Sequence, residues 1–100
     1  MKVLILPEAI SELESAVRYH RAIQPELGVR LRRELETRVV WASENPFVLR
    51  LRSGGYRRVN LAGFPYYTPY VIRGDVLWVL AFAHARQAPE YWTGRIPRPQ

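Results

Sequence analysis

The second half of the sequence concentrates the side chains that could do chemistry. Arg57 and Arg58 open one apolar–polar segment, and His84 and Arg86 lie at the end of another. A histidine can transfer a proton near neutral pH, and an arginine guanidinium can clamp a phosphate or a carboxylate. These groups would suffice to cleave RNA, because the RNA 2′-hydroxyl supplies the nucleophile. They suit equally a surface that binds an acidic partner.

Each of these candidates also has a structural interpretation. His84 could simply cap the last strand with a hydrogen bond, and we favour a structural or binding role for it over proton transfer. The arginines could be solvated charges at strand ends. Tyr91 and Trp92 could stack on a base, but such a pair more often anchors a C-terminal segment on the core. We favour the anchoring role for Trp92.

The sequence lacks the residues that several kinds of catalytic or binding site require. There is no cysteine, no glycine-rich phosphate loop and no acidic metal cluster, so neither a metal nor a cofactor is expected. Beyond residue 44 the only carboxylates are Asp75 and Glu90, too few for hydrolysis by a carboxylate pair. The first residues do not resemble a signal peptide, and no apolar stretch approaches the roughly 20 residues of a membrane helix. We therefore expect a cytoplasmic protein with no membrane contact.

The positive charge is segregated along the chain. The net charge is +6, and 14 of the 15 basic residues are arginines. Residues 1–44 carry seven basic and seven acidic side chains, whereas residues 45–100 carry eight arginines and two acidic residues. The entire excess therefore lies in the second half, as expected of a surface for nucleic acid or for an acidic protein.

The hydrophobic periodicity predicts an α+β fold with the order β-α-α-β-β-β, an antiparallel sheet and a helical hairpin packed on one of its faces. Prolines and glycines mark the boundaries between the elements. We expect a single domain over residues 1–96 and a loose tail over 97–100. The first helix should bury a stripe at a spacing of three and four, made of Ala9, Ile10, Leu13, Ala16, Val17, His20 and Ile23. The second helix should have Leu27, Leu31, Leu35, Val39 and Ala42 on one face and should stop at Asn45-Pro46. The strands are expected over residues 2–6, 56–61, 66–72 and 76–83.

Side-chain alternation predicts which strand residues share a face. On the last strand the small aliphatic face should seat the helices, and the aromatic face should be open. The two expected sets are Leu77, Val79, Ala81 and Ala83 under the helices, and Trp78, Leu80, Phe82 and His84 on the open face. Arg58 should also point away from the helices and form one groove with His84, Arg86 and either Tyr66 or Tyr67. A β-bulge would reverse this assignment, and Pro69 makes one plausible.

Six short motifs in this order and spacing resemble the RelE/ParE superfamily of toxins from bacterial type II toxin–antitoxin systems. The resemblance covers nearly the whole chain and is greatest to the ParE-type branch, often called plasmid stabilisation proteins. The motifs are Gln24-Pro25-Glu26-Leu27-Gly28, Asn45-Pro46, Arg57-Arg58-Val59-Asn60-Leu61, Phe64-Pro65-Tyr66, Arg73-Gly74-Asp75 and His84-x-Arg86-x-x-Pro89-x-Tyr91-Trp92.

The resemblance implies a cognate antitoxin, bound in a toxin–antitoxin hetero-oligomer, and a bacterial target. For ParE-like members the implied target is DNA gyrase, which is poisoned by binding; for RelE-like members it is ribosome-bound mRNA, which is cleaved. The RelE-like nucleases use a cluster of lysines and arginines with a C-terminal tyrosine. Here the C-terminal strands carry no lysine, and Tyr67 stands where those nucleases carry an arginine.

We therefore favour a gyrase-binding toxin over an mRNA interferase, and a relative that keeps only antitoxin binding is a third alternative. The residues assigned to target or antitoxin binding are Arg57, Arg58, Tyr66, Tyr67, His84, Arg86 and Trp92. If the chain is a nuclease, the catalytic candidates are His84, Arg86, Tyr91 and Arg58.

Overall fold

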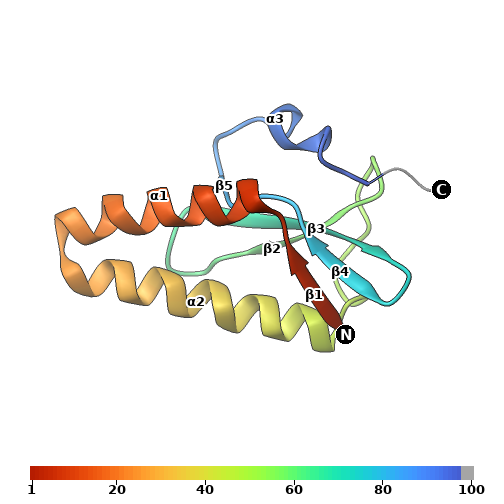
Figure 1. Ribbon diagram of the computed structural model, residues 1–100, viewed down its shortest axis with the longest axis horizontal. Helices are drawn as coiled ribbons and strands as arrows, with labels where there is room; N and C mark the ends of the chain where they lie inside the picture. The colour runs from red at the N-terminus through yellow and green to blue at the C-terminus, as the bar shows by residue number, and fades with distance from the viewer. Residues whose placement is uncertain (98–100) are drawn as a thin grey trace.

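The computed structural model describes residues 1–97 and has the predicted α+β order, with a short strand and a short helix added at its C-terminal end (Figure 1). The predicted loose tail begins at residue 97, and residues 98–100 lie outside the described range. The elements are β1 (Lys2–Ile5), α1 (Pro7–Ile23), α2 (Pro25–Glu44), β2 (Arg57–Asn60), β3 (Tyr66–Arg73), β4 (Val76–Val79), β5 (Ala83–His84) and α3 (Glu90–Thr93).

The two long helices form an antiparallel hairpin joined by the single residue Gln24. Each begins at a proline. Proline lacks a backbone N–H, and in the first turn this costs nothing because an N–H at that position would have no partner within the helix. The helices approach closely at Gly28, where an added Cβ would lie 3.2 Å from the carbonyl oxygen of Val17. Asn45 ends α2 as predicted, since both its backbone N–H and its side-chain amide bond to the carbonyl of Trp41.

The sheet has the strand order β1-β4-β3-β2, so β1 and β2 are its edges. Strands β2, β3 and β4 pair antiparallel, as predicted. However, β1 pairs in parallel with β4, so the sheet is mixed rather than wholly antiparallel. Residue alternation does not encode the direction of a neighbouring strand. Here the chain reverses direction between β2 and β3 and again between β3 and β4, and β4 then runs in the same direction as β1.

A β-bulge breaks the predicted last strand between β4 and β5. In the register with β3, Tyr70 pairs with Val79 but Tyr67 pairs with Ala83. Two residues of β3 therefore face the three residues 80–82, which is one residue more than a regular ladder allows. Pro69 lies opposite the break and has no N–H to donate, but its carbonyl accepts a hydrogen bond from Leu80 at 3.0 Å. The proline accompanies a bulge, as predicted, but in the neighbouring strand.

The bulge reverses the faces of the residues that follow it. Before it, Leu77 and Val79 lie in a core cluster with helix residues, as predicted. After it, Phe82 joins the helix-side cluster and Ala81 packs on the opposite face, which is the reverse of the expected alternation. His84 follows Phe82 to the helix side, beside Tyr66.

The hydrophobic core has two parts, one on each face of the sheet. The helix-side part contains Leu31 and Leu35 of α2 with Val17 of α1. The opposite face is covered by the C-terminal segment, which buries Trp92 against β3 and the bulge. None of the helices within residues 1–97 is long and apolar enough to cross a membrane.

Candidate protein-binding groove

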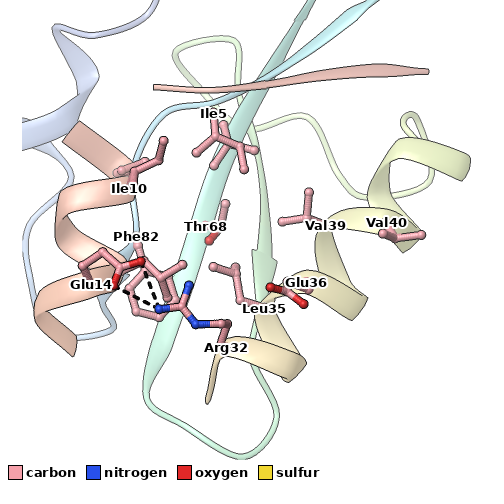
Figure 2. A pocket seen from close by; sticks show the side chains of 14 residues that line it. Ile5, Ile10, Glu14, Arg32, Leu35, Glu36, Val39, Val40, Thr68 and Phe82 are labelled. Atoms are coloured by element: carbon pink, nitrogen blue, oxygen red, sulfur yellow. Dashed lines mark hydrogen bonds and ion pairs between the residues drawn. The ribbon is translucent and has the colours of Figure 1, made fainter. Parts of the chain in front are cut away.

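An apolar groove of about 320 Å³ opens between α1, α2 and the sheet (Figure 2). Ile10 of α1 and Val40 of α2 stand at its sides, and Ile5 at the end of β1 closes its upper end in this view. The deeper wall contains the core residues Leu35 and Phe82. A largely aliphatic groove of this size suits an apolar ligand or the apolar side chains of a protein segment.

The rim of this groove exposes large aliphatic side chains. Ile5, Ile10 and Val40 are 41%, 47% and 56% exposed. The expectation that Ile10 and Ile23 are buried was therefore wrong. Ile10 falls at the opening of the groove rather than against α2, and Ile23, the last residue of α1, is 62% exposed. Burying aliphatic surface is favourable by about 25 cal/mol per Å², so a partner that covers this rim would gain free energy.

An ion pair crosses the groove at its lower end. One Nη of Arg32 on α2 lies 3.0 Å from both carboxylate oxygens of Glu14 on α1. Both side chains are about 40% exposed, so the pair contributes little to stability but ties the two helices together. Helical spacing would also allow Glu14 to pair with Arg18 one turn along α1, but Arg18 donates to the Ser15 hydroxyl instead.

The groove has one buried polar group on its floor. Thr68 of β3 is 1% exposed, and its hydroxyl has no hydrogen-bond partner among the described residues. Its side chain points into the groove from the helix-side face of β3 (Figure 2). A buried hydroxyl without a partner is unfavourable, so an occupant that offers a hydrogen-bonding group here would be stabilised.

A separate cluster on the same side of the sheet contains two of the predicted site residues. The rings of Tyr66 and His84 meet edge to face with centroids 5.5 Å apart. The Tyr66 hydroxyl lies 3.1 Å from Nε2 of His20, and burial raises the pKa of Tyr66 above its usual value. Nδ1 of His84 accepts a hydrogen bond of 3.1 Å from the backbone N–H of Arg86. The imidazole thus caps the end of the last strand, which is the structural role favoured above.

Tyr91 borders a shallow hollow beside this cluster, with Glu12 of α1 next to it. Its pKa is raised to about 12, mainly by burial and secondly by the Glu12 carboxylate, which the nearby Arg95 partly offsets. A phenol with this pKa keeps its proton at neutral pH and cannot serve as a general base there. Glu12 itself accepts hydrogen bonds from both terminal nitrogens of Arg95 and from the backbone N–H of Phe82 in the bulge.

The other predicted site residues lie on the opposite face of the sheet or at its edge. Arg58 points away from the helices, as predicted, and its guanidinium covers the ring of Tyr67 at 4.4 Å from the ring centroid. Tyr67 and Trp92 are buried, at 2% and 0% exposed. Trp92 therefore anchors the C-terminal segment, and neither ring presents a binding surface in this structure.

The predicted single groove of Arg58 with His84 does not form. The bulge places His84 on the helix side, whereas Arg58 remains on the other face. Arg57 donates through Nε to the Leu49 carbonyl at the β2 end of the sheet, and the Arg86 side chain is exposed to solvent. The predicted residues thus divide among three places instead of surrounding one site.

No protein-family model matches the sequence, and neither does any curated protein. The structure does match a chain of the chromosomal ParDE toxin–antitoxin system from P. aeruginosa. The TM-score is 0.75 over 86% of this chain and 97% of that chain, at 17% sequence identity. The chain has the RelE/ParE-like fold. The resemblance in the short motifs therefore predicted the fold correctly.

Within this RelE/ParE-like fold, sequence reasoning missed Glu12 and Thr68. Glu12 lies three residues after Ala9 and four before Ala16, so the helical period already placed its carboxylate beside the buried stripe. A carboxylate at such a position needs partners, which is a signal that could have found it. Thr68 sits in an apolar run, and nothing in the sequence distinguishes its hydroxyl from one that bonds within the sheet.

Proposed function

We propose that this chain is the toxin of a bacterial toxin–antitoxin pair and that a cognate antitoxin protein holds it inactive in the cytoplasm. The proposal is carried by one observation, the likeness in fold to a chain of a ParDE toxin–antitoxin system over nearly the full length of that chain. The segregated arginines agree with it, since an acidic antitoxin segment would complement the basic half of the chain.

We further propose that a segment of the antitoxin occupies the groove between α1 and α2. Its exposed aliphatic rim favours an amphipathic segment whose apolar side chains cover Ile5, Ile10 and Val40. The buried Thr68 hydroxyl favours a segment with one hydrogen-bonding side chain at the point of deepest insertion. Segments that fold upon binding often use such grooves, since the buried apolar area offsets the entropy cost of ordering them.

The mode of action proposed here is binding to DNA gyrase rather than cleavage of RNA. Two features support this choice, because each bears on a group that proton transfer would need. His84 Nδ1 already accepts a backbone N–H, and Tyr91 keeps its proton to about pH 12. Inhibition by binding needs no proton transfer and tolerates both.

An mRNA interferase is the second candidate function. The observation in its favour is that Tyr66, His84 and Tyr91 border the same shallow hollow beside α1. A phosphate held there could meet a phenol and an imidazole, although none of the described arginines lines this hollow. A relative that has lost toxicity and keeps only the antitoxin contact is the third alternative.

Expression from a tight promoter in bacteria tests these proposals. Induction of the chain alone should arrest growth, and co-expression with the neighbouring reading frame should restore it. A gyrase poison should trigger the DNA-damage response while protein synthesis initially continues, and His84→Ala should remain toxic. Immediate translation arrest with mRNA cut at ribosomes, lost in His84→Ala, would establish the interferase instead. Normal growth in every culture would remove the toxin proposal.

The groove assignment is tested by charge insertion at its rim. Ile10→Glu and Val40→Glu should weaken binding of the antitoxin at least roughly tenfold, because a carboxylate cannot enter an apolar contact without a large desolvation cost. Ile23→Glu is the matched control, since Ile23 is an equally large aliphatic residue on α1, 62% exposed and outside the groove. Equal loss of affinity in all three variants would exclude the groove as the antitoxin site.

A further inference from the structure

Strand β2 is an edge of the sheet, and its register with β3 shows which of its backbone groups are free. Arg58 lies opposite Pro69, which has no N–H, so these two residues cannot exchange hydrogen bonds. The bonded pairs are then Arg57 with Tyr70 and Val59 with Thr68, and the N–H of Leu61 continues this pattern by donating to the Tyr66 carbonyl.

In an antiparallel pair the backbone groups of alternate residues point to opposite sides of the strand. The N–H and C=O groups of Arg58 and Asn60 therefore point outward from the sheet. Neither residue's backbone has a hydrogen-bond partner outside the sheet within residues 1–97. Four backbone groups along this edge can thus accept an added strand.

The free edge lies in the most basic part of the chain. Residues 45–74 contain five arginines and no aspartate or glutamate. Four of these arginines belong to β2 or to the loop that precedes it, namely Arg50, Arg52, Arg57 and Arg58. A positive field without local counter-charges attracts an acidic partner and lowers the affinity for a basic one.

Two of these guanidinium groups are already held in place. Arg57 donates through Nε to the Leu49 carbonyl at 2.8 Å and lies over the Phe47 ring. Arg58 donates through Nε to the side-chain oxygen of Asn60 at 3.1 Å and lies over Tyr67. In both cases the terminal nitrogens have no hydrogen-bond partner within residues 1–97, and they are the pair that grips a carboxylate in two parallel hydrogen bonds. Because the planes are already oriented, less entropy is lost on binding.

The loop beside the edge also exposes apolar surface. Phe47, Val48 and Leu51 are 64%, 67% and 56% exposed and lie in the same six-residue stretch, 47–52, as Arg50 and Arg52. A nucleic acid would match the arginines but would leave the aliphatic groups and the outward backbone groups without partners. A polypeptide of alternating acidic and apolar residues would match all three features.

We propose that β2 and the loop of residues 47–52 bind an acidic polypeptide segment in extended conformation, which adds to the sheet as a strand beside β2. A second copy of this chain is disfavoured as the occupant, because it would bring Arg57 and Arg58 against the same two arginines. The site goes beyond the proposed function. It lies at the edge of the sheet opposite β1, whose Ile5 lines the groove assigned to the antitoxin.

Fluorescence anisotropy with the purified full chain tests the proposal. The probe is a labelled eight-residue peptide of alternating glutamate and valine. The comparison probes are the lysine–valine peptide and a single-stranded DNA of eight nucleotides. The acidic peptide should bind at least roughly tenfold more tightly than either comparison probe, and its affinity should fall as salt screens the arginines. Tighter binding of the DNA would establish a nucleic-acid site instead, and absence of peptide binding would overturn the proposal.

Strand addition itself is tested by removing one outward N–H. Asn60→Pro deletes the outward donor and leaves the bonded pairs with β3 intact, whereas Asn60→Ala loses the same side chain but keeps the donor. We expect a loss of about fivefold in peptide affinity for the proline variant relative to the alanine variant, as for one hydrogen bond. Equal affinities in the two folded variants would exclude strand addition.

A peptide N-methylated at alternate residues tests the same hydrogen bonds from the other side, should the proline variant not fold. Methylation of the odd-numbered or of the even-numbered residues leaves the charge of the peptide unchanged. The peptide whose methylated nitrogens would face β2 should lose most of its binding. Unchanged binding of both peptides would contradict strand addition. Neither toxicity nor the antitoxin enters these measurements, so a negative result here would leave the proposed function unaffected.

Discussion

The indole Nε1 of Trp92 donates a hydrogen bond of 2.9 Å to the hydroxyl of Tyr67, which lies 25 positions earlier in the chain. Both side chains are buried on the sheet face that the helical hairpin leaves uncovered. Tyr56 packs edge to face on the indole, and Arg58 covers the Tyr67 ring. This contact is one of the attachments that hold α3 in place, since a helix of four residues is too short to be stable alone.

We predict that Tyr67→Phe lowers the free energy of unfolding by about 1–2 kcal/mol, because it leaves the buried indole N–H without an acceptor. Urea unfolding followed by tryptophan fluorescence measures the change. Tyr19→Phe is the control, as Tyr19 is 64% exposed and should change stability by less than about 0.5 kcal/mol. Equal stability of the two variants would show that the Trp92–Tyr67 bond does not hold α3.

Glu12 and Arg95 form the second attachment of the C-terminal segment. Arg95 bonds both the Glu12 carboxylate and the Leu80 carbonyl, and the two charged side chains are only 24% and 18% exposed. We predict that Glu12→Gln lowers the free energy of unfolding by about 2 kcal/mol, because it leaves a half-buried guanidinium without its counter-charge. In this variant the amide hydrogen exchange of residues 90–96 should accelerate more than that of β3, relative to the wild type.

Glu14→Gln is the matched control for this prediction. It removes the same charge from the same helix, but its pair with Arg32 is about 40% exposed, so the expected loss is below about 1 kcal/mol. A larger loss for Glu14→Gln than for Glu12→Gln would contradict the assignment of Glu12 as an attachment of the C-terminal segment.

Thr68→Val should act in opposite directions on stability and on binding. In the isolated chain it replaces a buried hydroxyl that has no partner by a methyl group of the same shape, so the free energy of unfolding should rise by roughly 0.5–1 kcal/mol. It should also lower the affinity for the antitoxin by a few-fold, because the hydrogen bond proposed at the groove floor is lost. Thermal unfolding and titration calorimetry measure the two effects, and a less stable variant would mean that the hydroxyl is bonded in the free chain.

The raised pKa of Tyr91 predicts a loss of stability at high pH. The pKa of an unperturbed tyrosine is 10.0, and that of Tyr91 in the folded chain is about 12, because burial and the Glu12 carboxylate disfavour the phenolate. The folded state thus holds this proton more tightly, and the resulting stabilisation is complete below about pH 10 and disappears as the pH rises to about 12. Between about pH 9 and pH 11.5 the wild type should lose more stability in urea than Tyr91→Phe. Parallel losses would contradict the raised pKa.

The parts of the fold that depend on local spacing were predictable. Leu31 and Leu35 follow the helical period of α2 and are buried as expected, and Asn45-Pro46 ends that helix. Arg58 points away from the helices because strand alternation is unbroken over β2. In each case the relevant interaction is within a few residues, so residue order specifies it.

The candidate site was less predictable, because it depends on contacts between distant segments. Side-chain alternation predicted the correct sheet face up to Val79 and the wrong face at Phe82. The reason is that one extra residue in the bulge turns the later side chains to the other face. That single residue separates His84 from Arg58 and removes the predicted groove. The groove observed between α1 and α2 depends in turn on how far the helices diverge above Thr68, which no local pattern encodes.

The sequence by itself thus determined the elements, the buried stripe of α2, the basic character of the second half and the family of folds. Tertiary structure decided the parallel pairing of β1, the partners of Glu12 and the faces on which Tyr66, Tyr67 and His84 lie. The physical reason is the range of the interactions. Periodicity and turn chemistry act within a few residues, whereas strand direction, bulge position and buried-charge pairing follow from which distant segments meet in the folded chain.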